Sequence, residues 1–484
     1  MIVSPRISAG GRSGSVVGPT CCTNVATPST RTYFWGTRGA YMGPARSVKT
    51  RGRVCATSGG DMAGTTALAI HGGAPVRSRP WPAWPEHGEP ERAALLRVLE
   101  SGNWGGHPSP NTEGRGFADE FAAFVGTQHA VPCANGTFSL MLALQAARVP
   151  PGSEVITSAY TFVGTAGGII AAGCVPVFAD VDPDSYCLDP RAVEAALSPR
   201  TAAILPVHLA CSLADMDALG ALAGRNSLLV IEDCAHAHGA RWRDRRAGSL
   251  GQAGSFSLQS TKLLTSGEGG VVTTSDATIA SRLWSLVNCG RKEPGSDGFP
   301  EQMLGHNLRM TEFQAALARA QLLRLPEQNL RRARQVERFE RGIAGLSGLR
   351  PLARDARVTE RTSYQLVLRY DPAAFASVPR DHVILALRAE GVPCSGRFYS
   401  SLVDDPLFSS DPYTNPVSRA GISYTGQRFP VAERAANEES IWLPHELFLG
   451  DDSDTDDLLE AFARIGRHAP ELRARPPAGP VSRR

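Results

Sequence analysis

The chain has 484 residues, of which 42% are hydrophobic and 20% charged, a composition typical of a globular protein with one large and one smaller domain. No apolar run approaches the ~18 residues that a membrane-spanning helix needs, so we expect a cytoplasmic protein without a membrane partner. The ten cysteines form no CxxC pair and show no regular spacing, which predicts neither a disulfide framework nor a metal site.

The net charge of +3 combines two different regions. Residues 1–60 contain eight Lys or Arg and no acidic residue, whereas the rest holds 42 basic and 47 acidic residues, a balance of −5. This mildly acidic body gives no electrostatic reason to expect nucleic acid as a partner. Residues 1–61 lack hydrophobic periodicity, so we expect a disordered extension. It is either a transit-like peptide or the result of a start assigned upstream of Met62, and we favour the latter.

Short runs rich in Val and Ile alternate with helical patterns after about residue 126. The predicted strands are Glu154–Ser158, Val175–Asp180, Ala202–Val207, Leu228–Asp233, Gly254–Leu258 and Gly270–Thr274. The predicted helices between them include Thr137–Arg148, Pro190–Leu197 and Met216–Ala223. This alternation predicts an α/β fold with a mostly parallel central sheet covered on both faces. In such folds, ligands bind at the carboxyl ends of the strands.

A long helical pattern follows from Met310 to Leu346, and we interpret its Arg-rich middle, Leu330–Arg341, as a solvated helix linking two domains. Beyond it, Thr362–Tyr370 and the amphipathic stretch Arg380–Glu390 resemble parts of a small α+β domain. We therefore expect a large domain at 62–325, a linking helix and small C-terminal domain at 326–468, and a frayed tail at 469–484.

The chain contains 47 arginines but only three lysines, Lys49, Lys262 and Lys292. Of these two residue types, only lysine can lose its proton and attack a carbonyl. A Schiff base is therefore the first hypothesis for Lys262. This residue lies between a predicted strand and the turn Gly267–Gly270, where the backbone can pass close to a ligand. The alternative for any single lysine is a solvated surface position.

Asp233 ends a predicted strand, where a buried carboxylate needs a cationic partner such as a protonated pyridine nitrogen. A helix cap explains the same residue equally well. A metal site formed with His236 and His238 is disfavoured, because their spacing matches no recognised ligand pattern.

Two further segments could bind parts of a cofactor. Asn135-Gly136-Thr137 precedes a predicted helix, and the free N–H groups of a helix start suit a phosphate, although the same residues suit an ordinary turn and cap. Ser257 ends a strand and could offer its hydroxyl to that phosphate. Phe162 follows another strand and could cover a planar cofactor, although aromatics there often only pack.

Together these features match one chemistry, that of pyridoxal 5′-phosphate (PLP), which needs an imine-forming lysine, a carboxylate for the ring nitrogen, a phosphate cradle and a stacking group. The chain resembles the DegT/DnrJ/EryC1/StrS family of sugar aminotransferases, within the fold type I PLP enzymes, from about Pro80 to about Gly450. The resemblance is carried by Asn135–Thr137, Glu232–Gly239, Phe256–Gly270 and the segment Gly305–Ala316, which reads G-x-N-x-R-M-x-E-x-Q-A-A.

The resemblance implies catalytic roles for two residues. Lys262 would form the imine with PLP and then move the proton, and Asp233 would keep the pyridine nitrogen protonated. The family's dehydratase members replace this lysine by histidine, so Lys262 argues for an aminotransferase.

The resemblance also implies which residues bind the cofactor. Gly136, Thr137 and Ser257 would hold the phosphate, Phe162 would stack on the ring, and His236 would lie near the ring. Asn307 would reach the phosphate in the neighbouring subunit, which implies a homodimer with a shared active site.

Within the family, Arg79–Pro85 and Gln259–Gly270 look most like the cyclitol branch. This likeness implies amino transfer from L-glutamine, or glutamate, to a keto-cyclitol such as 2-deoxy-scyllo-inosose or scyllo-inosose, in aminoglycoside-type antibiotic biosynthesis. The alternatives are a nucleotide-linked keto-sugar aminotransferase, a 3-amino-5-hydroxybenzoate-type synthase and a non-catalytic PLP-binding regulatory protein.

Overall fold

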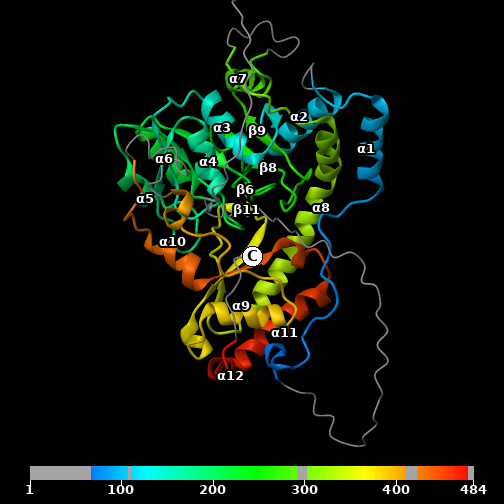
Figure 1. The fold of residues 1–484 in the computed structure, drawn as a ribbon, viewed down its shortest axis with the longest axis vertical. Helices are drawn as coiled ribbons and strands as arrows, with labels where there is room; N and C mark the ends of the chain where they lie inside the picture. The colour runs from blue at the N-terminus through cyan, green and yellow to red at the C-terminus, as the bar shows by residue number, and fades with distance from the viewer. Residues whose placement is uncertain (1–66, 107–110, 292–301, 409–421, 478–484) are drawn as a thin grey trace, which may run out of the picture. The chain divides into compact units, whose positions relative to one another are not determined.

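The computed structural model describes residues 67–106, 111–291, 302–408 and 422–477, which belong to one compact unit that runs from Ala63 to Arg484. The expected extension at 1–61 lies outside the described residues. A seven-stranded sheet lies in the upper part of the unit as drawn in Figure 1. From one edge to the other its strands are β1 (His129–Cys133), β9 (Gly270–Thr274), β8 (Ala253–Ser257), β5 (Leu229–Asp233), β4 (Thr201–Leu205), β2 (Glu154–Ser158) and β3 (Val175–Ala179).

The sheet is mostly parallel, as the alternating sequence pattern predicts. Strands β3, β2, β4, β5 and β8 pair in parallel, whereas β9 pairs antiparallel with both β8 and β1. All six strands predicted from the sequence are present, and their ends differ from the prediction by at most two residues. β1 was not among the predicted strands; it is short and contains Pro132.

Successive strand residues face opposite sides of the sheet, and a hydrophobic core lies on each side. Ile156 and Val271 belong to one core, while their neighbours Val155 and Val272 belong to the other. The helices that contribute buried residues to the first core include α2 (Thr112–Val125), α5 (Pro190–Ala196) and α6 (Met216–Arg225), and those of the second include α3 (Gly136–Ala146) and α7 (Ala277–Val287). The carboxyl ends of the parallel strands therefore open between two helical layers.

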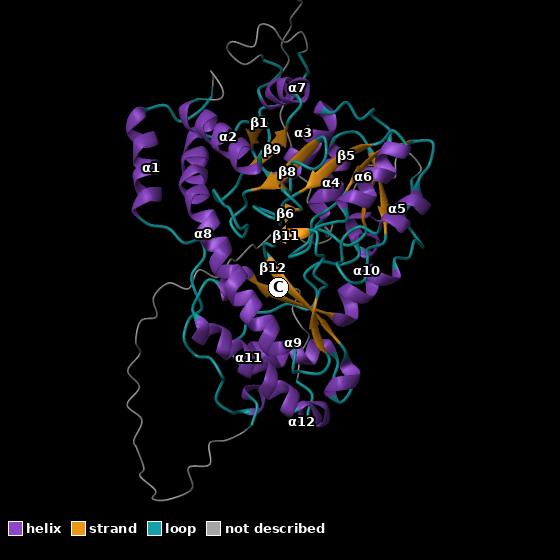
Figure 2. Cartoon of the chain, turned by 180° about the vertical axis from the view of Figure 1, so that it is seen from behind, coloured by secondary structure: helices purple, strands orange, loops and turns teal. Residues whose placement is uncertain are grey.

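The long helix α8 (Glu312–Ile343) runs from α1 (Glu89–Ser101) and α2 to the C-terminal part of the unit (Figures 1 and 2). Thr311 begins it with a capping box that includes Gln314. Arg332 and Phe339 are buried in the stretch predicted to be solvated. That prediction was wrong for one face of the helix, because the face packs on the core.

The C-terminal part contains a second, antiparallel sheet with strands β10 (Leu349–Pro351), β12 (Gln365–Tyr370) and β13 (Ser440–Pro444). We call this sheet, its helices and the described segments that connect them the small-sheet region. Its helices are α9 (Arg380–Ala389), α10 (Pro430–Arg434), α11 (Asp452–Arg467) and α12 (Ala469–Ala474). Helix α12 begins where the sequence predicts a frayed tail, and its Leu472 is buried.

The first described residues pack against the small-sheet region. The Ala69 N–H donates to the Glu390 carboxylate over 2.8 Å, and the Trp81 indole donates to the carbonyl of Gly391 over 2.7 Å. The expected large domain at 62–325 thus begins with a segment that contacts elements of the expected small one.

A third sheet joins the two parts of the unit through β11 (Val358–Glu360), β6 (Arg241–Trp242) and β7 (Arg245–Arg246). Among the described helices, none combines the length and hydrophobicity needed to cross a lipid bilayer.

Candidate active site

Asp233 lies at the carboxyl end of β5, in the middle of the large sheet, and is 5% exposed. Its carboxylate accepts hydrogen bonds from the Thr165 hydroxyl over 2.9 Å and from the Ala235 N–H over 3.1 Å. Burial raises the pKa of Asp233, while the two hydrogen bonds and the charge of Lys262 lower it and only partly compensate. A buried carboxylate of this kind favours a nearby cation.

Lys262 lies in the loop between β8 and β9, close enough to Asp233 for their charges to interact. Its Nζ atom is 4.3 Å from the centroid of the Tyr364 ring. Burial lowers the pKa of Lys262 to about 8, and the charge of Asp233 opposes this shift. The amine therefore loses its proton near pH 8, below the range of an exposed lysine, and the neutral form is the nucleophile.

The three residues predicted to bind phosphate lie close together, two at the start of helix α3 and one, Ser257, at the end of β8. Gly136 and Thr137 begin helix α3, and Asn135 caps it by accepting the N–H of Phe138 over 2.9 Å. A Cβ atom at Gly136 would lie 2.6 Å from the Cβ of Ser257. Only glycine fits there, so the helix N-terminus and the Ser257 hydroxyl lie side by side.

Phe162 lies beside this helix start, as the stacking role requires. A Cβ atom at Gly164 would meet the Phe162 ring at 2.8 Å and Thr137 Oγ1 at 2.9 Å, so these side chains are neighbours. Phe162 is 54% exposed, so its side chain is accessible to a planar ligand.

His236 is buried near Lys262, and both of its ring nitrogens have partners. Nδ1 accepts the N–H of Ala210 over 3.1 Å, so Nε2 carries the proton of the neutral ring and donates it to the Tyr399 hydroxyl 3.2 Å away. Burial lowers the pKa of His236 well below its usual range, and the charge of Lys262 adds to the effect. The ring is therefore neutral and fixed by its neighbours.

Asn307 is the one predicted site residue that the structure does not link to this group. It is exposed and forms an isolated antiparallel bridge with Asn288. Its surface position leaves it accessible to another subunit.

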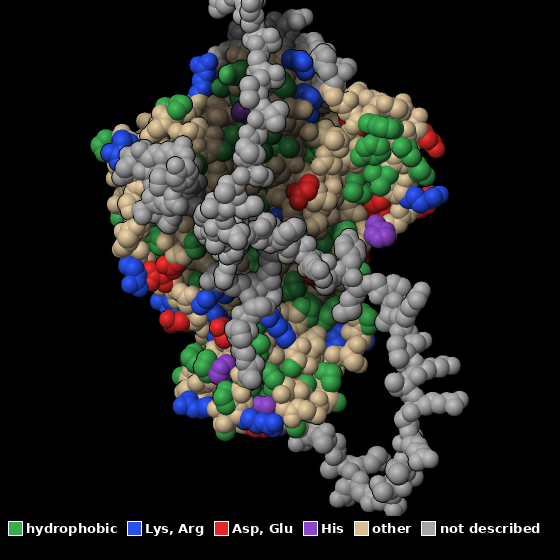
Figure 3. All heavy atoms as spheres, viewed as in Figure 1, with side chains coloured by type: hydrophobic (Ala, Val, Ile, Leu, Met, Phe, Trp, Pro, Cys, Tyr) green, Lys and Arg blue, Asp and Glu red, His purple; other side chains and the backbone are tan. Residues whose placement is uncertain are grey.

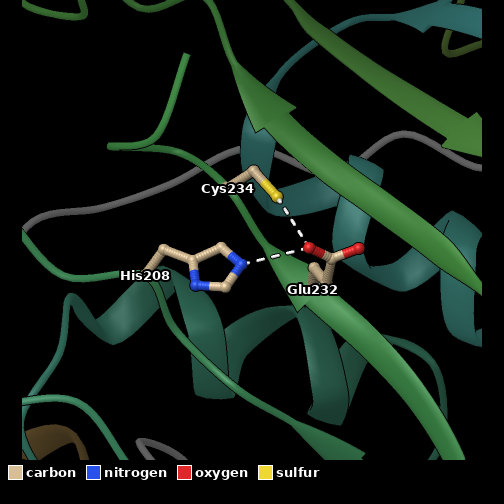
Figure 4. Close-up of side chains that lie close together, drawn as sticks. All are labelled: His208, Glu232 and Cys234. Atoms are coloured by element: carbon tan, nitrogen blue, oxygen red, sulfur yellow. Dashed lines mark hydrogen bonds and ion pairs between the residues drawn. The ribbon is translucent and has the colours of Figure 1, made fainter. Parts of the chain in front are cut away.

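A second buried cluster, His208, Glu232 and Cys234, contains metal-binding residue types (Figure 4). However, the Glu232 carboxylate already accepts the N–H groups of Gly248, Leu250 and Gly251 over 2.7–2.8 Å. His208 Nδ1 accepts the Ala214 N–H, so its Nε2 proton points at Glu232 over 3.1 Å. The cluster is therefore a hydrogen-bond network beside Asp233.

Several residues of the site were not predicted from the sequence, namely Thr165, Thr261 (directly before Lys262), Tyr364, Tyr399 and His445, whose Nε2 donates to the Thr261 carbonyl over 3.1 Å. Thr165 follows the same strand end as Phe162, and this position was the only available signal. The last three come from the small-sheet region, more than 100 residues beyond Lys262 or Asp233, and no local pattern links them to the site.

The residues present fit PLP. The glycine at 136 leaves space that a side chain would fill, beside N–H groups and a hydroxyl that suit a phosphate. The buried, partly compensated Asp233 suits a protonated pyridine nitrogen, and Lys262 has an amine with a lowered pKa.

Comparisons with known proteins agree with this chemistry. The model of the DegT/DnrJ/EryC1/StrS aminotransferase family matches residues 85–461. The chain is 46% identical over 415 residues to a protein of Streptoalloteichus tenebrarius provisionally named L-glutamine:3-amino-2,3-dideoxy-scyllo-inosose aminotransferase, covering 84% of this chain and 100% of the relative. An L-glutamine:2-deoxy-scyllo-inosose aminotransferase of the same organism is 42% identical over 429 residues, covering 84% and 99%.

Solved structures show the same fold. The crystal structure of 3-amino-5-hydroxybenzoic acid synthase matches with a TM-score of 0.71 and 32% identity, covering 81% of this chain and 100% of the other. The structure of DesI, solved in the presence of its TDP-sugar product, matches with a TM-score of 0.70 and 32% identity, covering 84% of this chain and 98% of the other. The chain therefore belongs to the DegT/DnrJ/EryC1/StrS family and is a PLP-dependent aminotransferase.

Proposed function

We propose that this enzyme transfers an amino group from L-glutamine, or glutamate, to the ring ketone of a keto-cyclitol. The observation that carries the proposal is the 40–46% identity to relatives named for 2-deoxy-scyllo-inosose and its 3-amino derivative, over nearly their whole length. The structural matches named for a hydroxybenzoate and a TDP-sugar are each 32% identical.

The choice of ketone follows the same identities. Relatives at 43–46% are named for 3-amino-2,3-dideoxy-scyllo-inosose, and those at 40–42% for 2-deoxy-scyllo-inosose. We propose that a ketone on an already aminated ring is the better acceptor, with 2-deoxy-scyllo-inosose and scyllo-inosose as the others to test. We propose that this reaction belongs to antibiotic biosynthesis and takes place in the cytoplasm.

In this proposal PLP would bind at the carboxyl ends of β5 and β8. Gly136, Thr137 and Ser257 would hold its phosphate, Phe162 would cover its ring, and Asp233 would hold the proton on its pyridine nitrogen. PLP, when bound, supplies the electron sink that lets the amino donor lose its Cα proton.

Lys262 carries the protons of the reaction. Its Nζ atom takes the proton from Cα of the amino donor and later delivers one to the acceptor carbon that has gained nitrogen. A pKa of about 8 suits both steps, because proton transfer is most efficient when the group titrates near the working pH. Asp233 stays ionised because its cation partner offsets the cost of burial.

We further propose a homodimer in which Asn307 reaches the phosphate in the partner's site. The exposed apolar residues Leu96 and Leu99 of α1 and Leu323 and Leu330 of α8 support a protein interface. Figure 3 shows hydrophobic side chains gathered where α1 lies. We retain the division into a large domain and a smaller C-terminal domain as part of this proposal.

The test mixes purified enzyme with L-glutamine and PLP, removes the donor, and then offers single ketones. Recovery of the visible absorbance of lysine-bound PLP, with formation of the aminated ring by mass spectrometry, identifies the acceptor. We expect recovery with keto-cyclitols. Recovery only with a nucleotide-linked keto sugar, or only with an aminohydroxybenzoate precursor, would contradict the cyclitol proposal, and no response to any amino donor would favour a regulatory protein.

A further inference from the structure

Tyr364 is a buried residue of the small-sheet region that contacts three parts of the site. Its ring stacks on His236 with centroids 4.2 Å apart and an angle of 27° between the planes. The same ring lies 4.3 Å from Lys262 Nζ, and its hydroxyl lies 2.8 Å from Oγ1 of Thr261. Its backbone N–H donates to the carbonyl of Ala210 over 3.0 Å, which fixes it beside the segment that binds His236.

The direction of the hydroxyl bond follows from the other partners of Thr261. The single hydroxyl proton of Thr261 goes to Oε1 of Gln259, 2.7 Å away, an oxygen that also accepts the Thr261 N–H over 2.9 Å. Thr261 Oγ1 can therefore only accept from Tyr364. Because the Thr261 carbonyl also accepts from Nε2 of His445 over 3.1 Å, the residue directly before Lys262 is held by two side chains of the small-sheet region.

We propose that Tyr364 is a positioning residue for Lys262, whose ring face stabilises the cationic form of Nζ and whose hydroxyl fixes the loop through Thr261. A cation over an aromatic face is attracted by the negative face of the ring, most strongly where water is excluded. Tyr364 is 4% exposed, so water competes little for this contact. The inference rests on the proposed role of Lys262.

Besides Tyr364, four ionisable groups interact electrostatically with Lys262, and only one of them stabilises a positive charge at Nζ. Asp233 is the one acidic group among them, at the end of β5. His236, His238 and His445 are buried, and burial together with the charge of Lys262 lowers their pKa values, that of His238 to about 3. The three rings are therefore neutral at working pH, and Tyr364 and Asp233 are the groups in this set that favour a cation at Nζ.

Two substitutions separate the ring from the hydroxyl. Tyr364→Phe keeps the aromatic face, whereas Tyr364→Leu removes it together with the hydroxyl, and Tyr364→Met serves instead if circular dichroism shows that the leucine variant is unfolded. The readout is the pH titration of the visible absorbance of the PLP-loaded enzyme, which does not depend on turnover. We expect the leucine or methionine variant to lose its protonated form at a pH lower by roughly half a unit or more, and phenylalanine to titrate within a few tenths of a unit of the wild type.

A second measurement uses the scarcity of lysine. In a Lys49→Arg, Lys292→Arg background Lys262 is the single lysine, so its modification by an amine reagent can be followed against pH in the amino-donor-treated enzyme. We expect the pH midpoint of this modification to be lower in the leucine or methionine variant than in the wild type, and to be nearly unchanged in the phenylalanine variant. A non-aromatic variant that titrates at or above the wild-type midpoint, or a phenylalanine variant that shifts as far, overturns the role of Tyr364. If instead Lys262→Ala keeps the lysine-bound absorbance, the proposed role of Lys262 fails first.

Discussion

The Thr165 hydroxyl donates to Oδ2 of Asp233 over 2.9 Å and thereby joins helix α4 (Val163–Ala171) to the end of β5. The Thr161 hydroxyl lies 3.0 Å from Thr165 Oγ1. Because the one hydroxyl proton of Thr165 goes to the carboxylate, Thr161 donates to Thr165, and the two form a short chain that ends at Asp233. These hydrogen bonds hold the carboxylate in one orientation. Within the described part of the protein its other lone pairs accept no hydrogen bond, so they can face a cation.

Replacing Thr165 by valine should therefore weaken PLP binding. The valine keeps the shape but removes a hydrogen bond to a buried charge, which is worth about 1.5–3 kcal/mol, so we expect the Kd for PLP to rise at least ~10-fold. Equilibrium dialysis of the reconstituted enzyme measures this change. Thr165→Ser, which restores the hydroxyl, is the matched control and should bind nearly as the wild type does; a valine variant with unchanged Kd would remove Thr165 from the site.

Asp233→Asn should separate binding from chemistry. The amide fills the same space but cannot hold a proton on the pyridine nitrogen, so we expect PLP to bind while the half-reaction with L-glutamine slows by roughly 10²–10⁴-fold. Stopped-flow absorbance with excess glutamine follows this step. A variant that reacts at the wild-type rate would show that Asp233 does not serve the cofactor.

PLP uptake should depend on pH with a midpoint near 8. Burial lowers the pKa of Lys262 to about 8, and only the neutral amine attacks an aldehyde. The rate of reconstitution of the apoenzyme should rise about tenfold per pH unit below pH 8 and level off above it, whereas an exposed lysine would continue to gain up to about pH 10.4. In Asp233→Asn the midpoint should move to lower pH, because the carboxylate raises the pKa of Lys262. A rate that keeps rising past pH 9 in the wild type would contradict the site geometry.

Asn307 should act in the partner's site, and mixing variants tests this. Lys262→Ala and Asn307→Ala are each expected to be impaired alone. If the site is shared, a mixed dimer regains one complete site, so random exchange of subunits should restore about a quarter of the wild-type activity. If Asn307 served its own subunit, every site in the mixture would carry one substitution, and the activity would not exceed that of the separate variants.

The sequence predicted most of the sheet, because strands such as Glu154–Ser158 and Leu229–Asp233 are short apolar runs that end at a polar or charged residue. Asp233 could be found because it ends a strand of a parallel sheet, where ligands bind. Lys262 could be found because lysine is scarce in this chain and this one lies between a strand and a glycine-rich turn. The two-residue strands at Arg241–Trp242 and Arg245–Arg246 could not, because they are too short and too polar to show a period of two. The burial of Arg332 was also missed, because its helix is polar overall and only tertiary packing selects the covered face.

The contacts around Lys262 are the clearest example of what local sequence patterns do not predict. Tyr364 and His445 reach Thr261 across 103 and 184 residues, so their position depends on how the small-sheet region packs. Local sequence carries no record of that packing. The segment before α1 also makes a contact that depends on tertiary packing. The Trp84 indole donates to the carbonyl of Ser260 over 3.0 Å, and neither composition nor periodicity predicts this hydrogen bond.

The central claim is that Lys262 is the amine that holds PLP and moves the proton, and the visible spectrum of the PLP-loaded enzyme tests it most directly. We compare wild type with Lys262→Ala and with Lys262→Arg, which keeps a positive charge but cannot join an aldehyde. Both variants should lack the pH-dependent visible absorbance of lysine-bound PLP, and neither should aminate a keto-cyclitol from L-glutamine. Either variant that shows the wild-type absorbance and turnover would contradict the account.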